Sequence, residues 1–274
     1  GLEPIVLEGP TATPVCAFAV KHLNAKGAVM ITASHNPPEY QGLKFIPFYA
    51  GPATPDITSV IESYIPDAPA KIKVAEGDAR TFDPTENYIA HVKSLVQISG
   101  NGQVVVTDTL HGVGGRYLPR ILRECGFEVV SINEELRPDF AGLSPEPKRE
   151  TLGNLASEAR KLKTLGLSTD GDADRFGIVD ENGDFYSANY ILTILYNYLL
   201  ESGRKGGVAR TVATTHMLDE IARIAGQPSW ETPVGFKYLG QLLLRENVLL
   251  AGEESGGASI AGHIPEKDGI MICL

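Results

Sequence analysis

The chain has 274 residues, of which 43% are apolar and 21% carry a charge. This composition is ordinary for a globular protein, and the length suits two or three small domains better than one. The net charge of −10 argues against general binding to nucleic acid or to an anionic membrane surface. No signal peptide is evident, and no apolar run reaches the roughly 18 residues of a membrane span.

Strands and helices alternate in the pattern of the first hundred residues. The apolar run Ile5–Leu7 predicts a short strand, and a helix is expected over 14–25 with Thr13 as its N-cap. The β-branched run over 28–32 predicts a buried strand, and Ser34 lies just beyond its end. The strand end therefore carries a hydroxyl.

A second unit follows a helix that we expect to bridge two domains. The sequence Asp-Pro-Thr-Glu at 83–86 is typical of a helix start, and Ile89, Val92 and Val96 share one face of that helix. The Asn-Gly pair within 181–184 predicts a hairpin, because it accepts positive φ angles. The expected elements of this unit are strands at 104–107, 129–132, 167–169, 176–180 and 185–187, with helices at 118–125 and 154–165.

A third unit is predicted beyond the Gly-rich segment 202–207, which resembles a linker. The apolar segment 190–200, just before it, is expected to form a buried helix. This repeated strand-helix pattern predicts several small α/β domains, each with a loop at the carboxyl end of a strand. The elements expected in the third unit are strands at 208–213 and 248–251 and helices at 217–225 and 238–244.

The three cysteines, Cys16, Cys125 and Cys273, lie far apart and lack the spacing of a metal site. They are expected to be reduced residues of the core. Reduced thiols indicate a cytoplasmic protein.

The hexapeptide TASHNP at 32–37 places Ser34 where α/β sheets commonly bind ligands. A hydroxyl at this position suits a nucleophile or a phosphate carrier. Serine, asparagine and proline also favour ordinary turns, so on these six residues alone both interpretations stay open.

The loop DGDADR at 170–175 carries alternating carboxylates that can direct three oxygens at one point, as Mg²⁺ or Ca²⁺ requires. An EF-hand would place Glu181 at its twelfth position, but Arg175 occupies the sixth, where that loop needs glycine. A solvated acidic turn is the other alternative. Arg175 either neutralises the carboxylates or binds a phosphate held by the same metal.

The loop GEESGG at 252–257 supplies two acids and a serine, which can hydrogen-bond to the hydroxyls of a sugar. A plain surface turn is the alternative. The segments 262–269 and 232–237 carry further polar groups. The glycines of 112–115 lack the G-x-G-x-x-G spacing, which argues against a dinucleotide site there.

Taken together, the three loops resemble those of the α-D-phosphohexomutase family, the phosphoglucomutases and phosphomannomutases. TASHNP, DGDADR and GEESGG occur in the family's order, and GHIPEKDG at 262–269 and VGFK at 234–237 extend the likeness over nearly the whole chain. The resemblance implies an α/β fold of three consecutive small mixed domains. These would be 1–97 with the phosphoserine loop, 98–203 with the metal-binding loop and 204–274 with the sugar-binding loop. It also implies that the first domain is incomplete and that the family's fourth domain is absent.

The resemblance implies a role for each matching residue of the first two loops. Ser34 would be the phosphoserine that exchanges a phosphoryl group with the sugar. Asp170, Asp172 and Asp174 would hold Mg²⁺, with a phosphate oxygen on Ser34 completing the site. Arg175 would contact phosphate.

Further residues are assigned by the same resemblance. Lys44 matches the lysine suspected as the general acid/base, a role that requires neighbours such as arginine or metal to lower its pKa. His35 lies beside the phosphoserine. The residues implied to bind substrate are Lys267, Glu253, Ser255, Val234 and Gly235.

The activity implied is the interconversion of hexose 1-phosphate and hexose 6-phosphate through a hexose 1,6-bisphosphate. The partner would be a sugar phosphate, and glucose 1,6-bisphosphate would act as intermediate and activator. Glucose is favoured as the sugar of the substrate, because the sugar-binding loop has the sequence GEESGG and not a GEMSGH-type sequence. Two alternatives stay open: a phosphomannomutase or dual-specificity mutase, and a truncated, non-catalytic core that binds metal and sugar phosphate.

Overall fold

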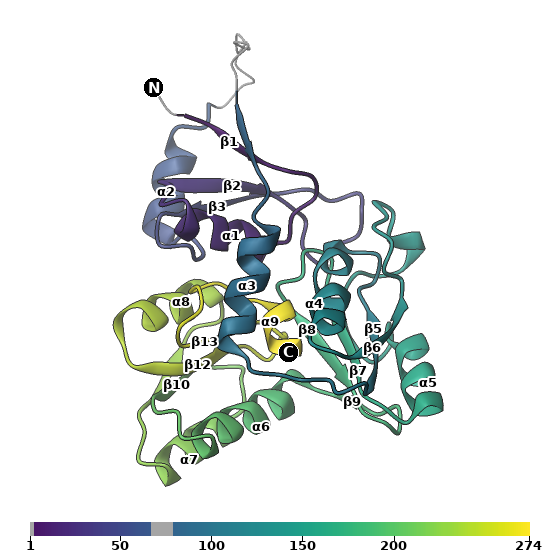
Figure 1. Cartoon of the computed structure of the whole chain (residues 1–274). Helices are drawn as coiled ribbons and strands as arrows, with labels where there is room; N and C mark the ends of the chain where they lie inside the picture. The colour runs from purple at the N-terminus through teal and green to yellow at the C-terminus, as the bar shows by residue number, and fades with distance from the viewer. Residues whose placement is uncertain (1–2, 67–78) are drawn as a thin grey trace.

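The computed structural model describes residues 3–66 and 79–274, which form three lobes that meet near the centre of the molecule (Figure 1). The first lobe holds two separate two-stranded sheets, one parallel and one antiparallel. Helix α1 packs on the antiparallel sheet. The elements of this lobe are β1 (Ile5–Leu7), α1 (Thr13–His22), β2 (Gly27–Ile31), β3 (Leu43–Pro47), α2 (Pro55–Ser63) and β4 (Arg80–Phe82).

Strand β2 forms where the sequence predicts it, but the expectation that the run is buried is wrong on one face. Val29 and Ile31 are each 64% exposed. In the described residues β2 pairs with β3 alone, which sets Val29 opposite Phe45 and Ile31 opposite Leu43. Residues directly opposite share a face, and the core covers the other face, where Met30 packs.

Helix α1 differs from the prediction at both ends. Its N-cap is Ala12, and Thr13 is the first helical residue. The Thr13 hydroxyl makes no cap because it donates to the buried carboxylate of Asp172 at 2.7 Å. The helix ends at His22, three residues before the predicted end, and Leu23 is its C-cap.

The second lobe is built on a five-stranded sheet in the order β6-β5-β7-β8-β9. The first three strands are parallel, and β8 and β9 run antiparallel to their neighbours. The predicted hairpin between β8 and β9 is present, with Gly183 at φ +80°. The elements are β5 (Val104–Asp108), η1 (Val113–Arg116), α4 (Leu118–Glu124), β6 (Glu128–Ile132), η2 (Phe140–Gly142), α5 (Gly153–Leu162), β7 (Gly166–Thr169), β8 (Phe176–Val179) and β9 (Phe185–Tyr186).

The third lobe carries a four-stranded sheet in the order β11-β10-β12-β13, in which only β13 is antiparallel. The predicted strands and helices are present, while β11 and β13 were not predicted. The elements are α6 (Ala188–Glu201), β10 (Gly207–Thr211), α7 (Met217–Ile224), β11 (Ser229–Thr232), α8 (Phe236–Arg245), β12 (Val248–Gly252), β13 (Ala258–Ile260) and α9 (Gly269–Cys273).

Helix α6 is buried on one side only, so the expectation of a buried helix is half wrong. Leu192, Tyr196 and Leu199 are buried, whereas Tyr190 and Ile194 are each 52% exposed. The exposed residues are four apart and therefore lie on one stripe of the helix surface.

Helix α3 (Thr85–Leu95) runs down the middle of the molecule, from the first lobe past α9 (Figure 1). Ile89 and Val92 are buried, as the predicted apolar face requires. The Tyr88 hydroxyl reaches the third lobe and donates to Asp268 at 2.7 Å. The helix thus physically links two lobes.

The three cysteines were expected to be reduced residues of the core, and the structure agrees for the two that are buried. Cys16 and Cys273 are buried, Cys125 is partly buried, and all three are free. Burial raises the pKa of Cys16 to about 11, which keeps this thiol protonated and unreactive. Among the described helices, none is both long enough and apolar enough to cross a membrane.

Candidate active site

The three loops singled out in the sequence meet in the folded chain. Ser34 follows β2 of the first lobe, and its Oγ donates to Asp172 Oδ1 at 3.1 Å and lies 3.4 Å from Asp170 Oδ2. The acidic loop in turn touches the loop after β12, where Arg175 forms a β-bridge with Gly257. The acidic loop leads into strand β8, which agrees with the exclusion of an EF-hand.

Ser34 has a left-handed backbone, with φ +55°, which is uncommon outside glycine and clusters at functional sites. Two hydrogen bonds hold this conformation. The Ser34 N–H donates to Thr32 Oγ1 at 2.8 Å, and the Thr32 hydroxyl donates to Asp172 Oδ2 at 3.1 Å. Thr32 therefore ties the serine turn to the acidic loop.

The two oxygens of Asp172 have different surroundings. Oδ2 accepts from Thr13 at 2.7 Å and from Lys44 Nζ at 2.9 Å, in addition to the bond from Thr32. These three donors leave Oδ1 for the Ser34 side. Sequence reasoning missed Thr13 as a site residue, because its position before an apolar helix matched an ordinary cap.

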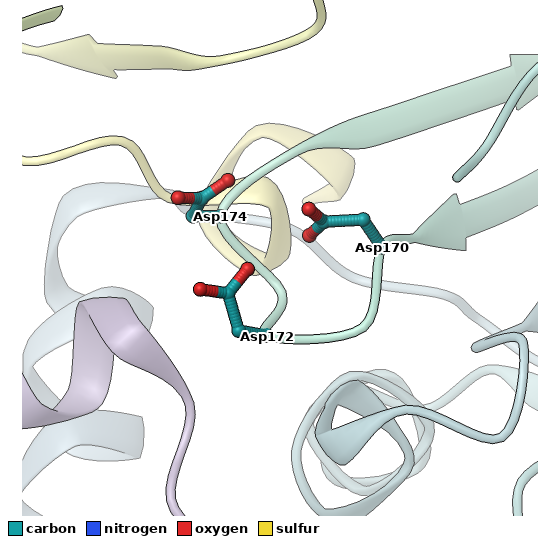
Figure 2. Close-up of side chains that lie close together, drawn as sticks. All are labelled: Asp170, Asp172 and Asp174. Atoms are coloured by element: carbon teal, nitrogen blue, oxygen red, sulfur yellow. The ribbon is translucent and has the colours of Figure 1, made fainter. Parts of the chain in front are cut away.

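The acidic loop gathers three buried carboxylates between β7 and β8 (Figure 2). Asp170, Asp172 and Asp174 each offer an oxygen, and these oxygens all lie within 4.8 Å of one another. Asp174 Oδ1 is buried and finds no hydrogen-bond partner among the described residues. Burial and the charges of the other two aspartates raise the pKa of Asp170 well above its ordinary value. This all-oxygen donor set, with an orphaned oxygen and crowded negative charge, fits Mg²⁺.

Two lysines face the same carboxylates. Lys44, on β3, lies 2.9 Å from Asp172 and 3.1 Å from Asp174, and Lys267 lies 3.0 Å from Asp174. Burial by itself would lower the pKa of Lys44, but Asp174 and Asp172 outweigh it and raise the pKa above its ordinary value. The protein groups alone therefore do not supply the lowered pKa that a proton acceptor requires, because the carboxylates dominate.

Arg175 of the acidic loop and His35 of the serine loop are close enough for the charge of Arg175 to act on the His35 ring. Arg175 Nε is buried without a hydrogen-bond partner in the described part of the chain and lies 4.0 Å from Asp174 Oδ1. Its Nη1 lies 3.6 Å from Glu146, a residue that the sequence reasoning did not single out. Burial, followed by the charge of Arg175, lowers the pKa of His35, which keeps that ring neutral.

The loop after β12 is tied to the turn before α8. Glu253 is buried, and its Oε1 accepts from the Gly235 N–H at 3.0 Å. Gly235 has φ +126°, which only glycine adopts readily. Ser255 is exposed, and Val234 is 58% exposed. The chain thus places four of the predicted substrate-binding residues on two connected turns.

The segment before α9 brings Lys267 to the acidic loop. A Cβ at Gly257 would lie only 2.2 Å from Lys267 Cδ, so the lysine passes directly over this glycine. Glu266, beside it, is buried, and its Oε1 accepts from the Lys267 N–H at 3.0 Å. Burial raises the pKa of Glu266 to about 7. The resemblance assigns a role to Lys267 within the segment 262–269 but none to Glu266.

Three family models match the chain in succession. They are described as α/β/α domains I, II and III of phosphoglucomutase/phosphomannomutase and match residues 1–71, 86–183 and 187–274. The lobes, their order and the three meeting loops define a protein of the phosphohexomutase class. The chain belongs to the phosphoglucomutase/phosphomannomutase family, as the resemblance in the sequence predicted.

Similar proteins cover nearly all of this chain. A Thermococcus kodakarensis phosphoglucomutase/phosphomannomutase is 34% identical over 96% of the chain and 59% of its own length. A probable phosphoglucosamine mutase of Pyrococcus abyssi is 35% identical over 90% of the chain and 55% of its own length. A solved Thermus thermophilus structure, described as a phosphomannomutase, superimposes with a TM-score of 0.94 at 36% identity, covering 100% of this chain and 63% of its own. The chain thus spans less than two thirds of these relatives.

Proposed function

We propose that the protein interconverts hexose 1-phosphate and hexose 6-phosphate, with Ser34 as the phosphate carrier and a hexose 1,6-bisphosphate as the intermediate. The observation that carries this proposal is the contact of the Ser34 hydroxyl with Asp172 at 3.1 Å, beside two lysines. The family supports the reaction type.

The charges around Ser34 suit phosphoryl transfer. This reaction depends on positioning and on neutralising the phosphoryl oxygens more than on covalent help. Lys44 and Lys267 approach the aspartates, and the buried Arg175 Nε has no hydrogen-bond partner within the residues that the structure describes. A bound Mg²⁺ would be held by the aspartates at 170, 172 and 174 and would supply further neutralisation of the phosphoryl group.

Lys44 is proposed to act as the proton donor at the serine. Its raised pKa keeps it an ammonium group in this arrangement. An ammonium can donate a hydrogen bond to a phosphoryl oxygen and can give a proton to the serine oxygen when the phosphoryl group leaves for the sugar. The amine so formed can take up the proton that the attacking sugar hydroxyl loses, so the lysine ends the step as an ammonium again. His35, which follows Ser34 in the chain, is proposed to lie against the phosphate. Because its ring is neutral, it adds no charge there.

Glu253 and Ser255 are proposed to bind the sugar hydroxyls, with Val234 and Gly235 setting the orientation of the ring. The sugar must present its carbon-1 and carbon-6 oxygens in turn, so the site has to accept two orientations. The bond from Gly235 N–H to Glu253 supports this assignment, because it makes the two turns one hydrogen-bonding unit.

The substrate is proposed to be a glucose phosphate, on the strength of the GEESGG loop. A second candidate is a glucosamine phosphate, favoured by the description of the Pyrococcus abyssi relative, and mannose phosphate is a third. Relative kcat/KM values on the three 1-phosphates, with Mg²⁺ and a trace of the matching bisphosphate, separate them. We expect glucose 1-phosphate to be turned over fastest. A higher value on either other sugar would reverse the assignment.

The same turnover assay, together with a calorimetric binding measurement, decides between a mutase and a non-catalytic core that only binds metal and sugar phosphate. Turnover that disappears in Ser34→Ala supports the mutase. Binding of the sugar phosphate by calorimetry, without turnover by the unsubstituted protein, would overturn it.

A further inference from the structure

A buried row of polar side chains connects helix α3 to the segment that carries Lys267. The Tyr88 hydroxyl donates to Asp268 Oδ2 at 2.7 Å, and His263 Nε2 lies 2.8 Å from the same oxygen. The other nitrogen of that ring, Nδ1, lies 3.0 Å from His91 Nε2. None of these four residues belongs to the three loops that meet at Ser34.

The row is buried deeply enough that each bond matters. Tyr88, Asp268 and the His263 side chain are 0% exposed. A buried carboxylate is tolerated when it is fully hydrogen-bonded, and Asp268 Oδ1 is also occupied, because it accepts from the Met271 N–H at 2.9 Å. The His263 ring therefore lies between Asp268 Oδ2 and His91 Nε2, and each of its two nitrogens has a polar atom within hydrogen-bond distance.

The row holds the side chain of Asp268, the neighbour of Lys267 on its carboxyl side, and two backbone hydrogen bonds hold the same stretch of chain. Asp268 follows Lys267 directly, and its N–H donates to Ala258 O at 2.9 Å. The next residue, Gly269, donates to Ala173 O within the acidic loop at 3.0 Å. The Lys267 ammonium then lies 3.0 Å from Asp174 Oδ2. A long, flexible lysine reaches one geometry reliably only if its backbone is held.

We infer that Tyr88, His263 and Asp268 are positioning residues that hold Lys267 against the acidic loop. This inference rests on the proposed function, since it assigns the lysine to the reacting site. We call Tyr88, His263 and Asp268 the clamp. The clamp makes α3 part of the active-site scaffold, because Tyr88 lies on that helix. A shift of α3 relative to the third lobe would therefore move Lys267.

Tyr88→Phe tests the clamp, with Tyr196→Phe as a matched control. Tyr196 is also fully buried, and its hydroxyl donates to Gly206 O at 3.1 Å in the third lobe. We expect Tyr88→Phe to lower kcat about tenfold with little change in KM, and the control to leave kcat unchanged. Equal losses in the two variants would show a general effect of burial and overturn the inference.

A double-mutant cycle asks whether the effect passes through Lys267. In a Lys267→Ala background, Tyr88→Phe should lower kcat no further, because there is no ammonium left to position. The same tenfold loss in both backgrounds would contradict the clamp. Thermal unfolding of all four proteins shows whether the variants are folded at the assay temperature.

A chemical readout separates this inference from the proposed function. Acylation of lysines with an N-hydroxysuccinimide ester, followed by peptide mass spectrometry, reports how well Lys267 is held without requiring turnover. We expect several-fold faster labelling of Lys267 in Tyr88→Phe and in Asp268→Asn than in the unsubstituted protein, and no change in Tyr196→Phe. Unchanged labelling in both clamp variants would overturn the inference, whether or not the protein is a mutase.

Discussion

The hydroxyl of Ser34 lies 3.1 Å from Asp172 Oδ1, although 138 residues separate them in the chain. The serine belongs to the first lobe and the aspartate to the second, so the site exists only when the two lobes are joined. Thr32 reinforces this contact by accepting from the Ser34 N–H and donating to Asp172. The geometry at the serine is therefore set by the acidic loop as much as by β2.

Asp172→Asn should weaken Mg²⁺ binding by about tenfold or more, because the substitution keeps the shape of the side chain but removes its charge. Isothermal titration with MgCl₂ measures this. Asp184→Asn, in the exposed turn before β9, is the control and should leave the titration unchanged. An equal affinity in Asp172→Asn would remove the acidic loop from consideration as the metal site.

Thr13→Val should also weaken Mg²⁺ binding, by about tenfold, although Thr13 is not expected to touch the metal. Its hydroxyl donates to Asp172 Oδ2 at 2.7 Å and keeps Oδ1 turned toward Ser34. Loss of such an orienting partner typically costs roughly 10–100-fold in metal affinity. Thr13→Ser retains the donor and should restore the affinity in the same titration. No rescue by serine would mean that packing of the threonine methyl matters instead.

Gly257→Ala should displace Lys267, because the new Cβ would lie 2.2 Å from its Cδ. We expect about 1–3 kcal/mol of lost stability from overpacking, together with a large loss of kcat. Urea unfolding and the mutase assay measure the two effects. Gly153→Ala is the matched control, since apart from its chain neighbours and the backbone of its own helix no atom of the described residues lies within 4 Å of a Cβ at that position. Full activity in Gly257→Ala would show that Lys267 is not needed where the structure places it.

His91 should make the fold less stable in mild acid. Burial, the neighbouring His263 and Lys21 lower the pKa of His91 while Asp268 opposes them, and the net effect brings it from 6.5 to about 4. Between these values the unfolded chain binds a proton that the folded chain does not, so stability is present above pH 6.5 and falls as the pH drops toward 4.

Urea unfolding at about pH 7 and about pH 5 measures this contribution. His91→Gln should lose less stability between the two pH values than the unsubstituted protein, because glutamine does not titrate. A larger loss in the variant would show that protonation of His91 stabilises the folded state.

The loops at 32–37, 170–175 and 252–257 were predictable because the residues that carry their chemistry lie close together in the sequence. The carboxylates at 170, 172 and 174, the serine after a strand and the acids after β12 each formed a recognisable pattern. The family order of these patterns predicted the three α/β domains, and the family models bear that out. Most strands and helices followed from hydrophobic period and turn residues.

What could not be predicted depends on contacts between distant parts of the chain. Thr13 matched a helix cap, and only the fold brings Asp172 to its hydroxyl. The exposure of Val29 depends on which strands flank β2, which no local pattern encodes. The raised pKa of Lys44 arises from two aspartates more than a hundred residues away. The elements β3, α2, β4, β11 and β13 were not predicted, and β11, with the sequence SWET, has no apolar run that would mark a strand.

The most direct test of the account is to locate the phosphoryl group. The protein is incubated with glucose 1,6-bisphosphate and Mg²⁺, digested, and its phosphopeptides are sequenced by mass spectrometry, with Ser34→Ala treated in parallel. We predict one phosphoryl group on Ser34 in the unsubstituted protein and none in the variant. A protein that turns over hexose phosphates while Ser34 stays unmodified, or that carries the phosphoryl group on another residue, would contradict the account.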